Sequence, residues 1–546
     1  METIKKAIEC HKKGDFANAE IFYLQYLEKN PDSARAYHLL GALYKAKKEY
    51  NKAQNALNTA LRLENIPEIE LELAFCYFEN NDFSNALPHF QNILKTTNDN
   101  DLEKILYDKI IECAKKLDLA DIFLEYSIKS LKFDPENIHK LREIAALAQD
   151  MEKFDTAKKY LEKLIEITPN DYVSYNNLGL VYEFTSDFKN AENCYRKAIA
   201  IKPNPEALYN LSVILRCQRK YEDALKTLEL TKQFDTNIEK FNHTFGVLHL
   251  VQKDFKTGYK PYLDFFKKKQ LPDIKDEFWW DGTKNKNATL AICATGGFGD
   301  VIMYSRYLDF INPDDFKEII LIVPKNLKSL YTYNFPQFKI IEMGINTKYN
   351  FATTLMDLPY IFNLDFAHIP SGEKYLLTPP KYVEKWQKYF AQNKTDKKIK
   401  IGIFFAGNAS NKRTLRNRNI NLKALKTIFS IEDIKFYSMQ PEGVYKEQLK
   451  TNNIMDLSGE IENFSDTAAI IDNMDLIISI DSSVAHLSGA LGKETFLLLP
   501  YSADWRWFED DSKTPWYNNT KIYRQTIEGD WMPVVKNLEN ALKSKL

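Results

Sequence analysis

The sequence has few cysteines, almost no net charge and no long hydrophobic run, and each shortage argues against a class of protein. Its six cysteines are scattered without any CxxC pair, which indicates reduced, mostly buried thiols. Lys and Arg total 74 against 75 Asp and Glu, so bulk binding to nucleic acid or a membrane surface is not expected. No apolar run approaches the ~20 residues of a membrane span, and the N-terminus lacks an apolar signal core. We therefore expect a cytoplasmic protein.

A repeat organises the first half of a chain that, at 546 residues, is too long for one core. An aromatic residue followed three positions later by Ala recurs with a period of 33 or 34 residues, and one interval of 71 spans a degenerate unit near Leu119. The copies are Phe16/Ala19, Tyr50/Ala53, Phe83/Ala86, Phe154/Ala157, Phe188/Ala191 and Tyr221/Ala224. Such a period predicts stacked pairs of antiparallel helices.

The best unit runs from Tyr175 to Pro203 and resembles the tetratricopeptide repeat (TPR). We count about eight repeats in residues 1–270 and expect an all-α superhelix whose concave face holds a peptide or protein. Four polar side chains are candidates for that face, although each also fits a solvated surface: Asn176, Asn177, Asn210 and Arg216.

After a linker at residues 271–288, short apolar runs alternate with helical stretches, which is typical of parallel sheets. The predicted strands are Thr289–Cys293, Glu318–Val323, Lys339–Met343, Ile401–Phe405, Lys435–Met439, Leu476–Ile480 and Thr495–Leu499. A polar break at residues 391–400 divides the region into two Rossmann-like lobes, 289–395 and 396–546. Ligands are expected in a cleft at the carboxyl ends of the strands. We expect the C-terminal helix, near residues 534–546, to pack on the first lobe.

A Gly-rich turn follows the strand predicted at Thr289–Cys293. Gly296, Gly297 and Gly299 permit a tight turn and expose backbone N–H groups. Asp300 comes next, at the start of a helix. It either caps that helix or faces the cleft and accepts a proton from an acceptor hydroxyl.

A basic loop follows the first strand of the second lobe. Its four cations either clamp a diphosphate or form a solvated surface, and they are Lys412, Arg413, Arg416 and Arg418. Gln440, at the end of the next strand, either reads a base or hydroxyl or caps its own loop.

The strand Leu476–Ile480 runs into a helix start that is suited to an anion. Ser482 and Ser483 would seat a phosphate there, and Asp481 would hold ribose hydroxyls or cap the helix. His486 has no partners at metal-ligand spacing and is expected to be a buried structural residue or part of the donor site, so no metal is predicted. Further along, Trp505 and Arg506 either contact a sugar or pack the lobe.

Together these motifs resemble TPR-linked glycosyltransferases related to glycosyltransferase family 9, the ADP-heptose transferase family. The matching segments keep the family order from Trp280-Asp281-Gly282 to Gly529-Asp530-Trp531. The resemblance implies a GT-B fold of two Rossmann-like lobes and inverting, metal-independent transfer from a nucleotide sugar, which is a co-substrate rather than a cofactor. It assigns the base to Asp300, places the glycine turn on the acceptor side, and adds Asn408 and Asp466 to the donor site. The chain departs from the family at Ala409 and at residues 294–297.

We therefore expect a glycosyltransferase that moves a sugar to a hydroxyl of an acceptor, a protein held by the TPR region. Two alternatives stay open. One keeps the chemistry but uses a glycan or lipid-linked acceptor, and the other is a TPR scaffold whose α/β half has lost catalysis.

Overall fold

The computed structural model describes residues 2–234, 238–271, 274–371, 374–407, 418–440, 445–510 and 512–546. The chain forms two compact units, Met1–Val181 and Tyr182–Leu546. This boundary lies inside the repeat helices and differs from a division near residue 270. The reason is that the last repeats pack on the α/β region, so they belong to the same compact unit as the two sheets.

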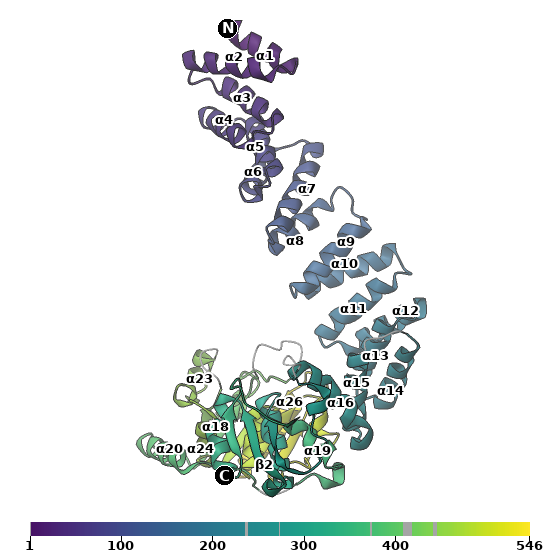
Figure 1. The fold of residues 1–546 in the computed structure, drawn as a ribbon, viewed down its shortest axis with the longest axis vertical. Helices are drawn as coiled ribbons and strands as arrows, with labels where there is room; N and C mark the ends of the chain where they lie inside the picture. Colours follow the sequence, from purple (N-terminus) through teal and green to yellow (C-terminus); the bar gives the residue numbers. More distant parts are fainter. Residues whose placement is uncertain are drawn as a thin grey trace. The chain divides into compact units, whose positions relative to one another are not determined.

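Eight pairs of α-helices fill the described part of residues 2–270, and Figure 1 shows those of the first unit as successive pairs. The helices are α1 (Glu2–Lys12), α2 (Phe16–Lys29), α3 (Ala34–Ala46), α4 (Tyr50–Leu63), α5 (Pro67–Glu79), α6 (Phe83–Thr96), α7 (Asn100–Lys116), α8 (Ala120–Ser130), α9 (Ile138–Asp150), α10 (Phe154–Ile167), α11 (Tyr172–Phe184), α12 (Phe188–Ile201), α13 (Pro205–Cys217), α14 (Tyr221–Leu230), α15 (Ile238–Val251) and α16 (Phe255–Gln270).

The recurring aromatic residue is the first residue of the second helix of its pair, as Phe16 and Tyr50 show for α2 and α4. The alanine three positions later is fully buried, and Ala19 and Ala53 are examples with no exposed surface. A side chain no larger than a methyl group lets the paired helices approach closely. The periodicity therefore predicted both the helix pairs and the position at which each second helix begins.

The turn inside each pair has a feature that the periodicity did not reveal. The residue two positions before each second helix has a positive φ, from Gly14 (77°) to Lys253 (68°). The intervening copies are Lys48, Asn81, Asp118, Glu152, Ser186 and Arg219. Only the first is a glycine, although a left-handed backbone costs other residues about 1 kcal/mol or more. The packing of the helix pairs therefore imposes this conformation on whichever residue stands there.

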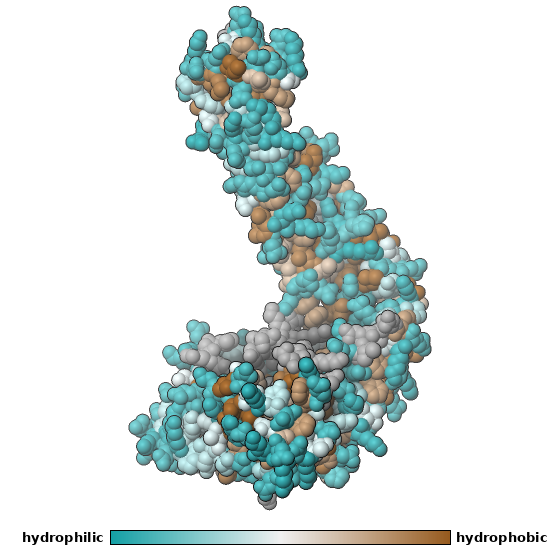
Figure 2. Space-filling model, in the orientation of Figure 1, coloured by the Kyte–Doolittle hydropathy of each residue, from teal (hydrophilic) through white to brown (hydrophobic). Residues whose placement is uncertain are grey.

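Two of the polar residues expected on the concave face are buried instead. Asn176 is 4% exposed and Asn210 is 7% exposed. Both lie on the first helix of a pair, α11 and α13, whose inward side packs against neighbouring helices. Figure 2 shows that the repeat surface on the face drawn is mostly hydrophilic, with hydrophobic residues interspersed. Within the described residues, no helix combines the length and the apolar character that crossing a membrane requires.

The C-terminal region holds two parallel sheets with helices between their strands. The strands are β1 (Asn285–Cys293), β2 (Phe316–Val323), β3 (Lys339–Glu342), β4 (Phe351–Thr354), β5 (Ile399–Phe404), β6 (Ile434–Ser438), β7 (Met455–Asp456), β8 (Leu476–Ile480), β9 (Thr495–Leu499) and β10 (Thr520–Arg524). The helices are α17 (Phe298–Tyr304), α18 (Lys328–Asn334), α19 (Leu358–Ile361), α20 (Pro380–Gln392), α22 (Lys426–Phe429), α23 (Lys446–Thr451), α24 (Phe464–Asp472), α25 (Ser483–Ala490) and α26 (Met532–Lys543), with the 3-10 turn η9 (Trp505–Trp507) after β9. All seven predicted strands are present, and β4, β7 and β10 are additional.

The order of the strands fixes where a ligand can bind. The first sheet has the order β3-β2-β1-β4 and the second β10-β9-β8-β5-β6-β7, and all the neighbouring strands are parallel. In each sheet the order reverses beside its first strand, between β1 and β4 and between β5 and β8. Ligands of such sheets bind outside the carboxyl ends of the strands at the reversal.

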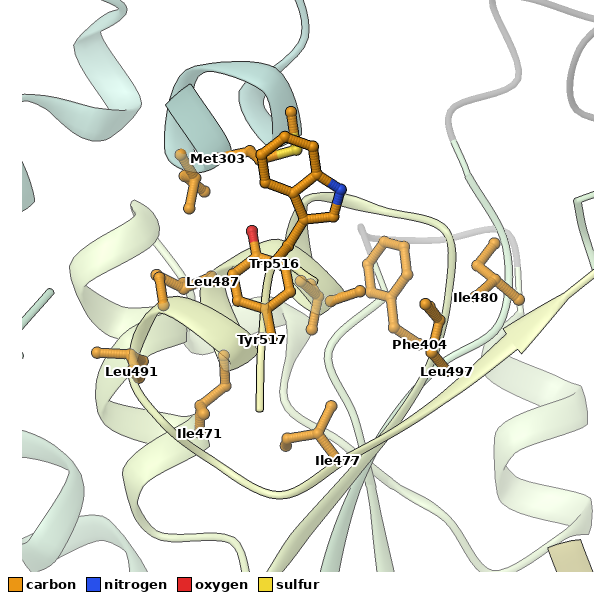
Figure 3. Packing of buried hydrophobic residues seen from close by; sticks show 14 of the residues in the cluster. Met303, Phe404, Ile471, Ile477, Ile480, Leu487, Leu491, Leu497, Trp516 and Tyr517 are labelled. Carbon is orange, nitrogen blue, oxygen red and sulfur yellow. The ribbon is translucent and has the colours of Figure 1, made fainter. Parts of the chain in front are cut away.

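The core of the second sheet reaches the first sheet through α25. Figure 3 shows Leu487 of this helix and Leu491, the residue after its end, packed with Ile477 of β8, near Tyr517 and with Met303 of α17 above. The C-terminal helix α26 packs against β10 and α22 of the second sheet. Our expectation that it packs on the first lobe was wrong, because its apolar side, which includes Val535 and Leu538, covers its own sheet.

Candidate functional site

Asp300 lies just past the carboxyl end of β1, at one of the two strand reversals. The turn before it needs glycine at residue 296, where φ is 100°. Oδ2 of Asp300 accepts a hydrogen bond from the Gly297 N–H at 3.2 Å, so the carboxylate caps α17. Its side chain remains 26% exposed. Because a carboxylate has about four lone-pair positions, capping leaves Asp300 able to accept a further proton.

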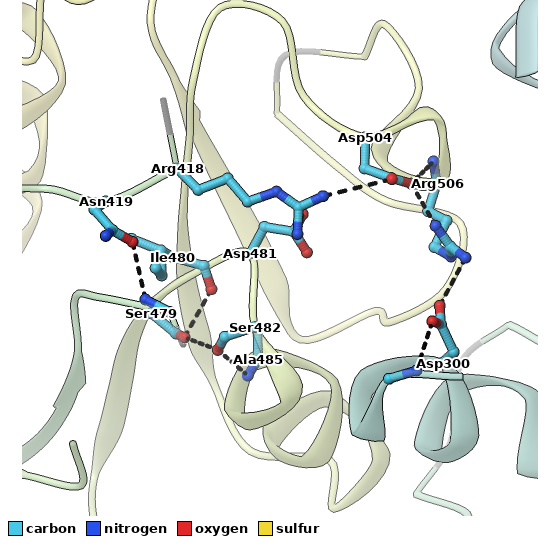
Figure 4. A network of polar contacts seen from close by, with 12 residues as sticks. Asp300, Arg418, Asn419, Ser479, Ile480, Asp481, Ser482, Ala485, Asp504 and Arg506 are labelled. Carbon is cyan, nitrogen blue, oxygen red and sulfur yellow. Dashed lines mark hydrogen bonds and ion pairs between the residues drawn. The ribbon is translucent and has the colours of Figure 1, made fainter. Parts of the chain in front are cut away.

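Asp300 also begins a chain of alternating charges that joins the two sheets (Figure 4). Its Oδ1 lies 2.7 Å from Nη2 of Arg506 in η9, and Nη1 of Arg506 lies 2.7 Å from Oδ1 of Asp504. Asp504 Oδ2 lies 3.6 Å from Nη2 of Arg418, whose Nη1 lies 3.3 Å from Asp481 Oδ2. The chain therefore connects the carboxyl end of β1 with that of β8.

The two carboxylates on either side of Arg506 differ in acidity. Burial raises the pKa of Asp300 above its ordinary value, while the Arg506 cation opposes that rise. At Asp504 burial is outweighed by Arg506 and Arg418, which hold its pKa at about 2. Two carboxylates whose pKa values are moved apart are typical of a site with distinct chemical roles. Asp300 is the one suited to exchange a proton.

The carboxyl end of β8 supplies the other half of the site. Asp481 follows the strand, and the Ser482 hydroxyl accepts from the Ala485 N–H to cap α25. The Ser479 hydroxyl shares a hydrogen bond with that of Ser482 at 2.9 Å, as Figure 4 shows. Ser483 is the first residue of the helix. The positive end of α25 therefore points toward the edge where Arg418 lies, a combination that favours an anion.

His486 holds α25 against α17. Its ring stacks on Trp507 with the centroids 5.0 Å apart, and Nδ1 lies 2.9 Å from the Tyr517 hydroxyl. A Cβ added at Gly299 would lie only 2.7 Å from the ring, so the glycine permits the two helices to touch. Burial, reinforced by nearby arginines including Arg506, lowers the pKa of His486 to about 3. The imidazole is thus neutral and structural, one of the two roles considered from the sequence.

This lowered pKa predicts an acid-sensitive second unit. The unfolded chain binds a proton at His486 below pH 6.5 while the folded chain does not, so stability falls as the pH falls from 6.5 toward 3. From pH 7 to pH 4 we expect this group to cost ~3 kcal/mol. The measurement is urea unfolding followed by tryptophan fluorescence, which reports on the second unit because all seven tryptophans lie between residues 279 and 531.

The control for this prediction is an exposed histidine. His486→Asn should flatten the pH dependence relative to the wild-type protein. His368→Asn should leave it unchanged, since that ring is 60% exposed. Parallel curves for the wild-type protein and the His486 variant would contradict the assignment.

Several predicted site residues make structural contacts instead. Trp505 is 2% exposed, and its ring meets those of Phe255, Tyr259 and Tyr262 edge-on, so no face is open to a sugar and that prediction is corrected. Both ends of the Gln440 amide bind the backbone of Phe405 and Ala406, which fits the loop-capping alternative.

Asp466 is completely buried and takes no part in the chain of charges. Its carboxylate accepts hydrogen bonds from Lys385, from the Trp386 indole and from the Glu462 N–H. These contacts tie α24 to α20. Four predicted donor residues, Asn408, Lys412, Arg413 and Arg416, lie outside the described residues.

Sequence reasoning missed Asp504 and Tyr262. Asp504 stands in the Asp-Trp-Arg-Trp motif. The signal available in the sequence was an acidic residue that precedes an arginine by two positions, close to the end of a strand. Tyr262 lies in α16, and its hydroxyl accepts from Arg506 Nη2 at 2.9 Å. No local pattern distinguishes it from the other aromatic residues of the repeats.

One family of known proteins matches parts of the repeat region. The tetratricopeptide repeat family matches residues 22–55, 137–204 and 176–235. Protein FlbA of Caulobacter vibrioides is 22% identical over 332 residues, 53% of this chain and 51% of FlbA. The chain thus spans about half the length of this curated relative.

Solved structures of repeat proteins are similar to part of this chain. One is YrrB, described as a TPR protein with an unusual peptide-binding site, with 18% identity, coverage of 34% of this chain and 96% of YrrB, and a TM-score of 0.25. Another is the TPR2AB domain of yeast Sti1 in complex with pHSP90, with 18% identity, coverage of 48% and 97%, and a TM-score of 0.25. The family matches and the eight helix pairs show that the all-helical N-terminal part of this chain, roughly its first 260 residues, is built of tetratricopeptide repeats.

Proposed function

We propose that the C-terminal region is a glycosyltransferase of the GT-B type that moves a sugar from a nucleotide-sugar donor to an acceptor hydroxyl. The observation that carries this proposal is the chain of charges from Asp300 to Asp481. It joins the strand reversals of two parallel sheets, which are the two places where such sheets bind ligands. One end offers a carboxylate with a raised pKa, and the other offers a cation beside a helix N-terminus.

In the proposed reaction, the acceptor oxygen attacks the anomeric carbon of the donor from the face opposite the diphosphate. The new bond joins the acceptor oxygen to that carbon, and the bond from the carbon to the diphosphate oxygen breaks. The hydroxyl proton moves to Asp300, whose raised pKa suits a general base. The electron pair leaves with the nucleoside diphosphate, whose charge is stabilised by Arg418 and the start of α25.

The repeats give the proposal its acceptor. TPR helices commonly hold peptides or proteins, and YrrB is described as having a peptide-binding site. A protein acceptor held by the repeats therefore fits the chain better than a glycan or lipid-linked acceptor. A TPR scaffold with an inactive C-terminal region remains the competing function. The repeat matches favour this function as directly as they favour a transferase with a protein acceptor.

Donor binding tests the proposal. We expect one nucleoside diphosphate or its sugar, in the presence of EDTA, to raise the melting temperature of the second unit as read by tryptophan fluorescence. At 100 times the dissociation constant the stabilisation should be about 2.7 kcal/mol. Arg418→Ala should abolish the shift, because it removes the cation beside α25. Asp300→Asn should retain it, because the base contacts the acceptor.

Lys450→Ala serves as the matched control, since Lys450 is an exposed cation of the same lobe. It should bind the donor as the wild-type protein does. If a complete set of nucleoside diphosphates and their sugars leaves the melting temperature unchanged, the scaffold function is favoured instead.

A further inference from the structure

The last repeat contributes a side chain to the candidate active site. We propose that Tyr262 of α16 is a positioning residue that holds Arg506 against Asp300, an inference that rests on the proposed transferase function. The repeats would then do more than carry an acceptor, because the chemistry at Asp300 would depend on the last helix of the array.

The contact is made by a single nitrogen atom. Nη2 of Arg506 lies 2.9 Å from the Tyr262 hydroxyl and 2.7 Å from Asp300 Oδ1. Nη1 of the same guanidinium binds Asp504. A planar guanidinium fixed at both terminal nitrogens has one orientation. Tyr262 and Asp504 together therefore determine where the cation meets the Asp300 carboxylate.

Tyr262 is itself held rigidly. Its ring is 3% exposed and packs on Trp505, the residue next to Arg506. A Cβ added at Gly246 of α15 would lie 2.7 Å from the Tyr262 N atom, so α15 and α16 cross in direct contact at this residue. The position of the hydroxyl is thus set by the packing of the last helix pair.

Two possible roles of the repeats predict different kinetic effects of a change at Tyr262. If they only captured the acceptor, a change at Tyr262 would alter the KM for the acceptor. If Tyr262 orients Arg506 and Asp300, the change would lower kcat and alter the pH dependence, because Arg506 opposes protonation of Asp300. The buried hydroxyl contacts the charge network and not the outer surface of the array, which favours the second role.

Tyr262→Phe in the full-length protein tests the inference, since it removes the hydroxyl and keeps the ring that packs on Trp505. A hydrogen bond to a charged group is lost, and kcat should fall by about tenfold with the donor KM unchanged. The acid limb of the kcat profile should move to higher pH by ~0.5–1 unit, because a less firmly held Arg506 lowers the pKa of Asp300 less.

Tyr221→Phe is the matched control. The Tyr221 hydroxyl donates to Glu509, so it also joins a repeat helix to the second sheet, but away from Arg506. Its kcat and acid limb should match those of the wild-type protein. An active wild-type protein whose Tyr262→Phe variant retains both values, or changes only in acceptor KM, would overturn this inference alone. A wild-type protein that binds donor but transfers no sugar to any acceptor would overturn the proposed function and this inference with it.

Discussion

Replacing Asp300 by Asn is expected to slow sugar transfer by ~10²–10⁴-fold, the range found when a general base is removed. Asn keeps the size of the side chain and one oxygen that can accept from Gly297, but it cannot take a proton from the acceptor. The measurement is the single-turnover rate of transfer from the nucleotide sugar identified by the binding experiment. The affinity for the donor should stay within about twofold of the wild-type value, because the substitution removes stabilisation of the transition state and not of the bound donor.

The fold of the variant needs a separate check, since Asp300 also caps α17. Asp365→Asn is a suitable control, because Asp365 caps a turn through the Ala367 N–H and lies outside the charge network. Both variants should remain folded, whereas only Asp300→Asn should lose activity. Transfer at the wild-type rate by Asp300→Asn would show that the carboxylate is only a cap.

The largest expected loss of stability follows from Arg506→Met. This change removes the cation between Asp300 and Asp504 and leaves two carboxylates in a mostly buried site. Breaking a buried pair in this way costs about 3–5 kcal/mol. Urea unfolding of the second unit, monitored by tryptophan fluorescence at neutral pH, measures it. The partial exposure of Asp300 places the expected value at the lower end of that range.

The pH dependence of this loss identifies its cause. Without Arg506 the folded-state pKa values of both carboxylates rise above the unfolded values. The variant therefore becomes less stable as the pH rises from the unfolded pKa values to the folded ones. The loss should therefore be larger at pH 8 than at pH 5. Arg306→Met provides the comparison, because Arg306 is also buried but donates to the carbonyl oxygens of Met303, Pro370 and Trp516. Equal losses for Arg506→Met at both pH values would contradict the role assigned to the ion pairs.

Elements with local and repeated signals could be predicted from the amino-acid sequence. An aromatic residue and an alanine three positions apart, recurring every 33 or 34 residues, predicted the helix pairs, because small and large side chains must alternate where helices stack. Apolar runs such as Leu476–Ile480 predicted buried parallel strands, because both faces of such a strand are covered. The glycine turn and Asp300 were placed at a strand end for the same local reason. β4 and β10 were missed because at least half of the residues in Phe351–Thr354 and Thr520–Arg524 are polar.

Which of the candidate residues act together depends on how distant segments pack. Arg506 and Tyr262 are 244 positions apart, and no periodicity relates them. Trp505 and Asp466 stand in motifs that suggested a ligand site, yet their surroundings bury them against α16 and α20. Burial and the neighbouring charges, which set the pKa of Asp300, Asp504 and His486, depend on distances in space. Local sequence fixes the conformation that a segment prefers, whereas a site between two sheets and a repeat helix exists only once those elements have packed.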